Sequence, residues 1–244
     1  MLSSVGKRLA DTDPVIRSRS FKKLRNICKK PVTDYSELLR LWRGLWYALW
    51  MADKRVNQTA VAVEAVQLGQ AYSDADYTLW TRAFFETLIS MWSRLDKWRM
   101  DKFLLLVRVF VAETFRRLHL SSWNETMIGN FNKEMCMLST RCLGATMHIA
   151  RVFWEELEAE ISCVEDSEPV SMKTFIGLLD GMVEIASTSN FQALVRRECE
   201  DVLLDHRFPK KLVQMVVKKL RTKALAQDID QEIREILCDT VERL

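Results

Sequence analysis

The sequence predicts an all-α fold. Of its 244 residues, 48% are hydrophobic and 28% are charged, proportions typical of a folded globular chain. It holds only 7 Gly and 4 Pro, residues that tight turns between strands use heavily, which argues against an all-β fold. Apolar residues recur at helical spacing, whereas strand alternation is almost absent. We predict one all-helical domain over residues 1–244, with about 10–11 helices.

The first predicted helix follows a strong start signal. Asp13 is a good N-cap residue, and Pro14 suits the first helical position. The helical pattern continues to the break at Pro31. We expect its apolar side to consist of Val15, Phe21, Leu24 and Cys28.

The second predicted helix has an unusually wide apolar face. Thr33 or Asp34 caps it, and its Leu and Trp residues cover about 180° of the circumference. Such a helix is expected to be buried between neighbours on two sides. The sequence therefore predicts that this segment forms part of the core.

The tryptophan row of the second helix allows two interpretations. Trp42, Trp46 and Trp50 recur at every fourth residue, and Arg40 and Arg43 flank the first of them. Aromatic rings beside basic residues can stack the bases of single-stranded RNA. We favour core packing, because four leucines share the same helix face.

The remaining helices follow with short connections. Residues 103–112 are apolar around nearly the whole circumference, which predicts a central core helix. The acidic stretch that ends near Pro169 predicts a mobile connection around 163–170. The predicted helices lie at 56–72, 75–93, 100–118, 124–143, 145–162, 171–187, 190–205, 209–224 and 228–243.

The spacing of the helix starts suggests paired units. Alternate helices begin near 34, 75, 124 and 171, and their partners begin near 56, 100, 145 and 190. This spacing is about that of HEAT and armadillo helical pairs. The sequence thus predicts an irregular HEAT/armadillo-like solenoid, with a compact bundle as the alternative.

Charge is unevenly distributed although the net charge is only +3. Residues 1–30 and 205–223 are strongly basic, while residues 155–168 and 224–244 are acidic. A local basic field attracts phosphate, but a basic helix also suits solvent, a membrane surface or an acidic protein. We favour phosphate contact more for the first segment, because the acidic C-terminal residues can neutralise the second. The candidate RNA-backbone residues are Arg17, Arg19, Lys22, Lys23, Arg25, Lys210, Lys211, Lys218, Lys219 and Arg221.

The acidic stretch at 155–168 carries no basic residue. It could attract a basic protein, although plain solvation explains it as well. Whether it ends a helix or forms a partner-binding loop stays open at this point.

Motifs of catalysis and cofactor binding are absent from the sequence. No phosphate-binding loop, dinucleotide fingerprint, nucleophile elbow or HExxH occurs, and paired carboxylates are expected by chance among 33 acidic residues. The six cysteines form no CxxC pair and the three histidines are isolated, which favours reduced core cysteines over a metal site. We expect an intracellular protein that is not an enzyme, with no cofactor, small-molecule substrate or membrane association.

Two segments resemble a known family. LLRLWRGLWYALWMADK (38–54) is similar to the LWKGLFYCMWMSDK-type signature of the eukaryotic ribosomal RNA processing protein 1 family, and LDKWRMDKFLLLVR (95–108) resembles its IDRLRLDKFYMLIR-type segment. The basic IRSRSFKKLRN also matches the family's N-terminal region. The sequence departs at Arg55-Val56, where a Lys-Pro step is common, and it lacks the long basic tail of many relatives.

The resemblance implies a nucleolar assembly factor of the nucleus that acts in ribosomal RNA processing and large-subunit biogenesis. Members are non-catalytic helical scaffolds that contact precursor ribosomal RNA and other assembly factors, including Brix-domain and WD-repeat proteins. The alternative is a cytoplasmic HEAT-type adaptor that binds proteins and never meets RNA. Both are protein-binding scaffolds; they differ in compartment and in RNA contact.

The matching motif residues are interpreted as structural. Asp101 and Lys102 can cap the start of a buried helix, and Arg108 needs a buried carboxylate partner. Asp53 and Lys54 close the tryptophan helix. The full set of motif residues is Trp42, Gly44, Trp46, Trp50, Asp53, Lys54, Arg99, Asp101, Lys102, Phe103 and Arg108.

Overall fold

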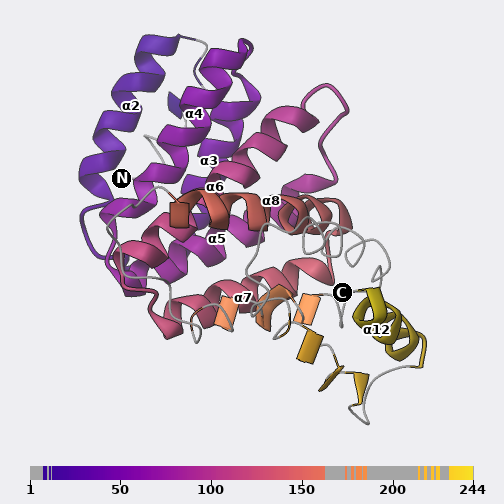
Figure 1. Cartoon of the computed structure of the whole chain (residues 1–244). Helices are drawn as coiled ribbons and strands as arrows, with labels where there is room; N and C mark the ends of the chain where they lie inside the picture. Colours follow the sequence, from indigo (N-terminus) through magenta and orange to yellow (C-terminus); the bar gives the residue numbers. More distant parts are fainter. Residues whose placement is uncertain are drawn as a thin grey trace. The chain divides into compact units, whose positions relative to one another are not determined.

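The computed structural model confirms the all-α fold class (Figure 1). No residue that it describes lies in a strand. Two compact units are present, Met1–Arg117 and Leu118–Leu244, so the single domain stays a prediction. The described residues are 8, 9, 11, 13–162, 174, 177, 178, 180–182, 184, 185, 214, 217, 218, 221, 222, 224, 225 and 231–243.

Helices of the first unit begin where the sequence predicts them. Asp13 and Asp34 act as N-caps, because their carboxylates accept hydrogen bonds from the Val15 and Ser36 amides at 2.8 Å. The Ser73 hydroxyl caps the next long helix in the same way. The elements are α2 (Pro14–Ile27), α3 (Tyr35–Trp50), α4 (Arg55–Gln67), the 3₁₀ helix η1 (Leu68–Ala71), α5 (Asp74–Trp92) and α6 (Met100–Leu120).

Aromatic side chains of α3, α5 and α6 form the core of the first unit. The Trp42 ring centroid lies 4.2 Å from that of Trp80, and the Trp42 indole donates to the Trp80 carbonyl at 3.2 Å. Phe84 stacks on Phe110 with centroids 3.7 Å apart. Trp42 is only 1% exposed, so core packing is confirmed and base stacking by this ring is excluded.

The apolar side of α2 is confirmed at three of its four predicted positions. Phe21, Leu24 and Cys28 are buried, but Val15 is 53% exposed, so that part of the prediction is wrong. At about 100° per residue, Val15 lies on the side of the helix opposite Leu24. By the same geometry Arg17 points close to the direction of Leu24, and it is buried.

The second unit contains helices at both of its ends. Asn124 caps the first of them by accepting from two backbone amides, after a turn in which Ser122 and Trp123 have positive φ. In the middle, the Asn132 side-chain amide donates to the Gly177 carbonyl at 2.8 Å. The elements with described bounds are α7 (Glu125–Ser139), α8 (Leu143–Ser162) and α12 (Gln231–Arg243).

Several sequence predictions concern the later part of the chain. All described positions within the predicted helices 171–187 and 209–224 are helical. Leu225, which follows the second range, lies in a turn. The predicted helix at 190–205 and the connection at 163–170 lie outside the described residues. Paired starts are confirmed at 35, 74 and 125 and at 55, 100 and 143, while the HEAT/armadillo repeat type stays a prediction.

The cysteines lie in different environments. Cys28 and Cys142 are buried, as expected for core cysteines, and Cys136 is half-buried. Cys238 of α12 is exposed, as are the neighbouring charged residues Arg234, Glu235 and Asp239, so the core assignment is wrong for this residue. The remaining two cysteines lie outside the described residues.

Candidate nucleic-acid interface

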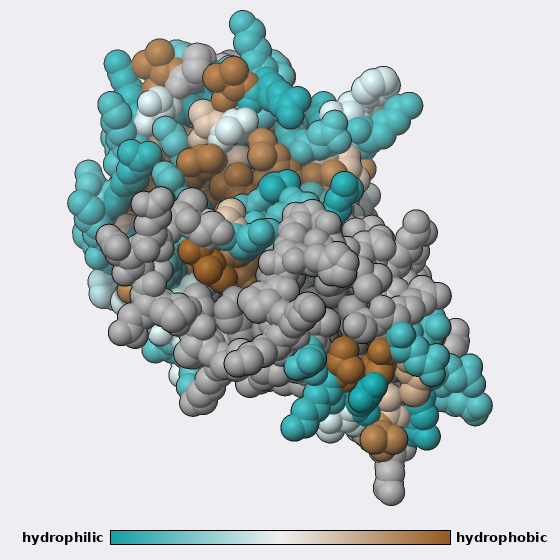
Figure 2. Space-filling model, in the orientation of Figure 1, coloured by the Kyte–Doolittle hydropathy of each residue, from teal (hydrophilic) through white to brown (hydrophobic). Residues whose placement is uncertain are grey.

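The outward side of α2 is a continuous basic surface. Arg19, Lys22 and Lys23 are exposed on it, and Figure 2 shows hydrophilic residues along this edge of the molecule, at left in the view. These three cations line a hollow of about 590 Å³ together with Arg8. One carboxylate, that of Asp11, also lines it. The arrangement offers several cations to phosphate groups in one place.

Two of the predicted α2 contact residues are engaged within the protein. Arg17 is 8% exposed, and its guanidinium donates to the Asp11 carbonyl at 2.6 Å. It therefore holds the chain before α2 in place and does not fit the predicted role as a surface contact. Arg25 is exposed but lies 3.9 Å from the Glu64 carboxylate of α4, which partly neutralises its charge.

The second basic segment is described only in part. Lys218 and Arg221 are exposed at helical positions. Because they are three residues apart, they share a helix face. Lys210, Lys211 and Lys219 lie outside the described residues, so their role in RNA contact stays a prediction.

Lys102 ties the start of α6 to the end of α3. The residue is 7% exposed, and its ammonium donates to the Trp50 carbonyl at 2.6 Å and to the Ala52 carbonyl at 3.0 Å. Carbonyls at a helix C-terminus lack intrahelical donors and carry partial negative charge. Burial lowers the pKa of this ammonium. Lys102 therefore caps the end of another helix, and the prediction that it caps its own is wrong.

Arg99 lies beside the same corner. Its guanidinium carbon lies 4.4 Å from the Trp50 ring centroid and it pairs with Asp96. Trp50 is half-buried, unlike Trp46, which stacks on Phe103 with centroids 4.0 Å apart. Both contacts attach α6 and the loop before it to α3.

Other motif residues lie on the surface. Asp53 and Lys54 are exposed between α3 and α4, and Lys54 is the N-cap residue of α4 with no side-chain capping bond. Asp53 and Lys54 follow the end of α3, as predicted. The side chain that donates to the last carbonyl of this helix, that of Trp50, is however Lys102. Gly44 is half-buried within α3.

Asp101 and Arg108 occupy exposed positions of α6. Asp101 lies in the first turn, where a negative charge favours the helix. Arg108 lies on the solvent side of α6, so it is not buried as the prediction assumed. A cation within an apolar stretch can reach solvent when one side of the helix stays open.

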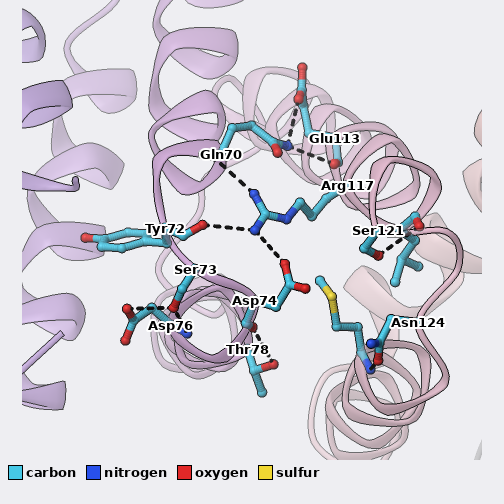
Figure 3. Close-up of polar contacts among 12 residues, drawn as sticks. Gln70, Tyr72, Ser73, Asp74, Asp76, Thr78, Glu113, Arg117, Ser121 and Asn124 are labelled. Carbon is cyan, nitrogen blue, oxygen red and sulfur yellow. Dashed lines mark hydrogen bonds and ion pairs between the residues drawn. The ribbon is translucent and has the colours of Figure 1, made fainter. Parts of the chain in front are cut away.

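Arg117 forms a polar cluster that sequence reasoning missed (Figure 3). Its guanidinium donates to the carbonyls of Gln70 and Tyr72 and to the Asp74 carboxylate, the last at 2.7 Å. The Gln70 amide in turn donates to Glu113. These bonds fix the corner between η1 and α5 against α6. Glu113 and Arg117, one turn apart on α6, were the available signal.

The described residues were compared with the requirements of metal sites and of membrane-spanning helices. Within the described ranges no cluster of His, Cys, Asp and Glu could hold a metal ion, and none of the helices there is both long and apolar enough to cross a bilayer. Of the acidic segment, residues 155–162 form the end of α8, where Glu160 pairs with His119 at 2.8 Å; the rest lies outside the described residues.

Comparison with known proteins decides the family. The profile described as "Nucleolar protein, Nop52" matches residues 2–238, nearly the whole chain. The chain belongs to the Nop52 family. This confirms the resemblance that the two motif segments indicated.

Relatives of this Nop52-family chain carry the ribosomal RNA processing name. The "Ribosomal RNA processing protein 1 homolog" of Drosophila melanogaster is 33% identical over 163 residues, which are 62% of this chain and 24% of the relative. Homolog A of Homo sapiens is 30% identical over 168 residues, 63% of this chain and 36% of the relative. Homolog A of Mus musculus is 29% identical over 177 residues, 66% and 35% respectively. The chain thus spans about a quarter to a third of the length of these relatives.

Proposed function

We propose that this chain is a helical scaffold that acts in ribosomal RNA processing and in biogenesis of the large ribosomal subunit, in the nucleolus. Its membership of the Nop52 family, over residues 2–238, carries this proposal. The names of its relatives agree with it. The partners implied by the family resemblance, Brix-domain and WD-repeat assembly factors, belong to the proposal.

The scaffold role is non-catalytic. The tryptophan-rich motif is used for packing, because Trp42 and Trp46 are at most 2% exposed. Lys102, the most buried charged side chain of the motif, is occupied with two backbone carbonyls. These conspicuous motif groups are therefore committed to holding α3 and α6 together.

The basic side of α2 is the proposed contact with the RNA backbone. Arg19, Lys22 and Lys23 point to solvent together, and phosphate contacts of this kind carry no sequence information. Each neutralised phosphate of a single strand contributes about 0.7 to the slope of log affinity against log salt. Three contacts therefore contribute a slope of about 2.

The test is the salt dependence of binding to a fluorescein-labelled RNA. Replacing Arg19, Lys22 and Lys23 by alanine should reduce the slope by about 2. A matched control replaces three exposed cations of the second unit by alanine, and its slope should stay at the wild-type value. An unchanged slope for the α2 variant would rule out this helix as the contact. The control residues are Lys133, Arg141 and Arg151.

A second experiment separates this function from the cytoplasmic adaptor. The full-length protein should co-sediment with large-subunit precursors after mild nuclease treatment and should be nucleolar in cells. Cytoplasmic location without co-sedimentation would favour the adaptor. The family match favours the nucleolar role.

A further inference from the structure

The loop before α6 presents a tryptophan to solvent. Trp98 is 83% exposed, the largest exposed fraction among the large hydrophobic side chains in the described part of the chain. By contrast, Trp42, Trp46 and Trp80 are at most 2% exposed, and Trp50 and Trp92 are half-buried. A single exposed apolar side chain is common on protein surfaces, so the meaning of this one depends on the residues around it.

The backbone that carries Trp98 is held firmly. The Asp96 carboxylate accepts from the amides of Trp98 and Arg99, both at 3.0 Å, and pairs with the Arg99 guanidinium. Arg99 in turn lies over Trp50, at the end of α3. The ring is therefore presented outward from an anchored turn, and binding there requires little ordering of the loop.

Cations adjoin this ring in the sequence, and one of them lies against it in space. The Lys97 ammonium lies 4.8 Å from the Trp98 ring centroid. Arg94, in the same loop, is also exposed, whereas the negative charge of Asp96 is paired with Arg99. Lysine is depleted at protein–protein interfaces, and the residue that lies against the Trp98 ring is Lys97. Exposed aromatic rings with neighbouring cations are the combination that binds single-stranded nucleic acid.

We propose that Trp98 is a stacking surface for an unpaired base of single-stranded RNA, with Lys97 and Arg94 binding the adjoining phosphates. This inference rests on the proposed role in ribosomal RNA processing and adds a second contact that differs from α2. The α2 surface binds phosphates of any RNA strand. Trp98 selects strands whose bases are free to stack.

The test compares a fluorescein-labelled 12-nucleotide oligouridine with a 12-base-pair RNA duplex by fluorescence anisotropy. Trp98→Ala should weaken oligouridine binding about 5- to 140-fold, because loss of one base stack costs about 1–3 kcal/mol. Affinity for the duplex should change less than about twofold, because its bases are already stacked. Trp98→Phe should keep most of the oligouridine affinity. In the wild type, oligouridine should also quench tryptophan emission, and this quenching should be absent in Trp98→Phe.

Two controls separate this inference from the proposed function. Leu120→Ala removes another exposed apolar side chain, 74% exposed, and should leave both affinities unchanged. The triple alanine variant of α2 should weaken both RNAs alike. Equal oligouridine affinity of wild type and Trp98→Ala would overturn the inference and assign the ring to a protein partner. Failure of the wild type to bind oligouridine would overturn it too, while co-sedimentation with precursors would still support the proposed function.

Discussion

Replacing Lys102 by methionine tests the cap that joins α6 to α3. Methionine keeps a four-atom apolar stem but lacks the Nζ group, which lies 2.6 Å from the Trp50 carbonyl and 3.0 Å from the Ala52 carbonyl. A hydrogen bond from a charged group contributes about 1.5–3 kcal/mol. Two effects reduce this loss. The Ala52 carbonyl still accepts a hydrogen bond from the Gln58 side-chain amide at 3.1 Å, and the variant avoids the cost of burying a charged ammonium. We therefore expect a net loss of about 2 kcal/mol.

The assay is urea unfolding followed by tryptophan fluorescence. Six of the eight tryptophans lie in the first unit, so the signal reports mainly on its core. With a urea dependence of about 2 kcal/mol per molar, the midpoint should fall by about 1 M. The control Lys97→Met changes an exposed cation nearby and should shift the free energy of unfolding by less than about 0.5 kcal/mol. Equal midpoints for wild type and Lys102→Met would refute the capping argument.

The pH dependence gives an independent check on the same residue. Burial lowers the pKa of the Lys102 ammonium below its ordinary value of 10.5. The unfolded chain therefore holds this proton to higher pH than the folded chain, and folding gains stability as pH rises through that window. The free energy of unfolding of the wild type should rise relative to that of Lys102→Met between the lowered pKa and pH 10.5. A parallel pH dependence for the two proteins would contradict the assignment.

Further predictions concern close packing and a buried thiol. A methyl group at Gly69 would meet the Trp80 indole, with Cδ1 at 2.6 Å, so Gly69→Ala should lower the free energy of unfolding by about 1–3 kcal/mol. Gly129 in α7 has open space around it, so Gly129→Ala should raise the free energy of unfolding by about 0.5–1 kcal/mol. Urea titrations of both variants test these two predictions. Burial raises the pKa of the Cys28 thiol, so the unfolded chain loses this proton at lower pH than the folded chain. The free energy of unfolding of the wild type should therefore fall above the ordinary thiol pKa more steeply than that of Cys28→Ala. Urea midpoints measured between about pH 8 and 10 check this.

Local signals in the sequence were sufficient for the helices and for much of the core. Asp13 and Asp34 are short polar side chains directly before apolar periodicity, and both cap as predicted. Trp42 and Trp46 share a face with leucines, which is why their burial followed from spacing alone. These features depend on residues within one or two helical turns.

Side-chain partners between helices were harder to predict. Lys102 resembles a residue that caps its own helix, but its partners are some 50 positions earlier in the chain. Arg108 was expected to be buried because its neighbours are apolar, yet it occupies the exposed side of α6. The spacing of apolar residues shows which side of a helix is buried. It does not show which other helix packs against that side.

Some residues of the candidate RNA-binding surfaces could be predicted from the sequence, and others could not. Arg19, Lys22 and Lys23 were predicted to be accessible and are exposed. Arg17 could have been removed from that set by its helical angle, since it lies close to the direction of Leu24. Trp98 could not have been selected, because a tryptophan beside an apolar helix start predicts burial more often than exposure.

The aromatic stack between α3 and α6 also bears on synthesis of the chain. Trp46 stacks on Phe103 and Phe84 stacks on Phe110, so these two rings gain their stacking partners only when α6 is available. A nascent chain that has emerged only as far as α5 therefore exposes several indole and phenyl rings. Folding of this unit as it leaves the ribosome should be a late event, and until then it depends on protection from aggregation.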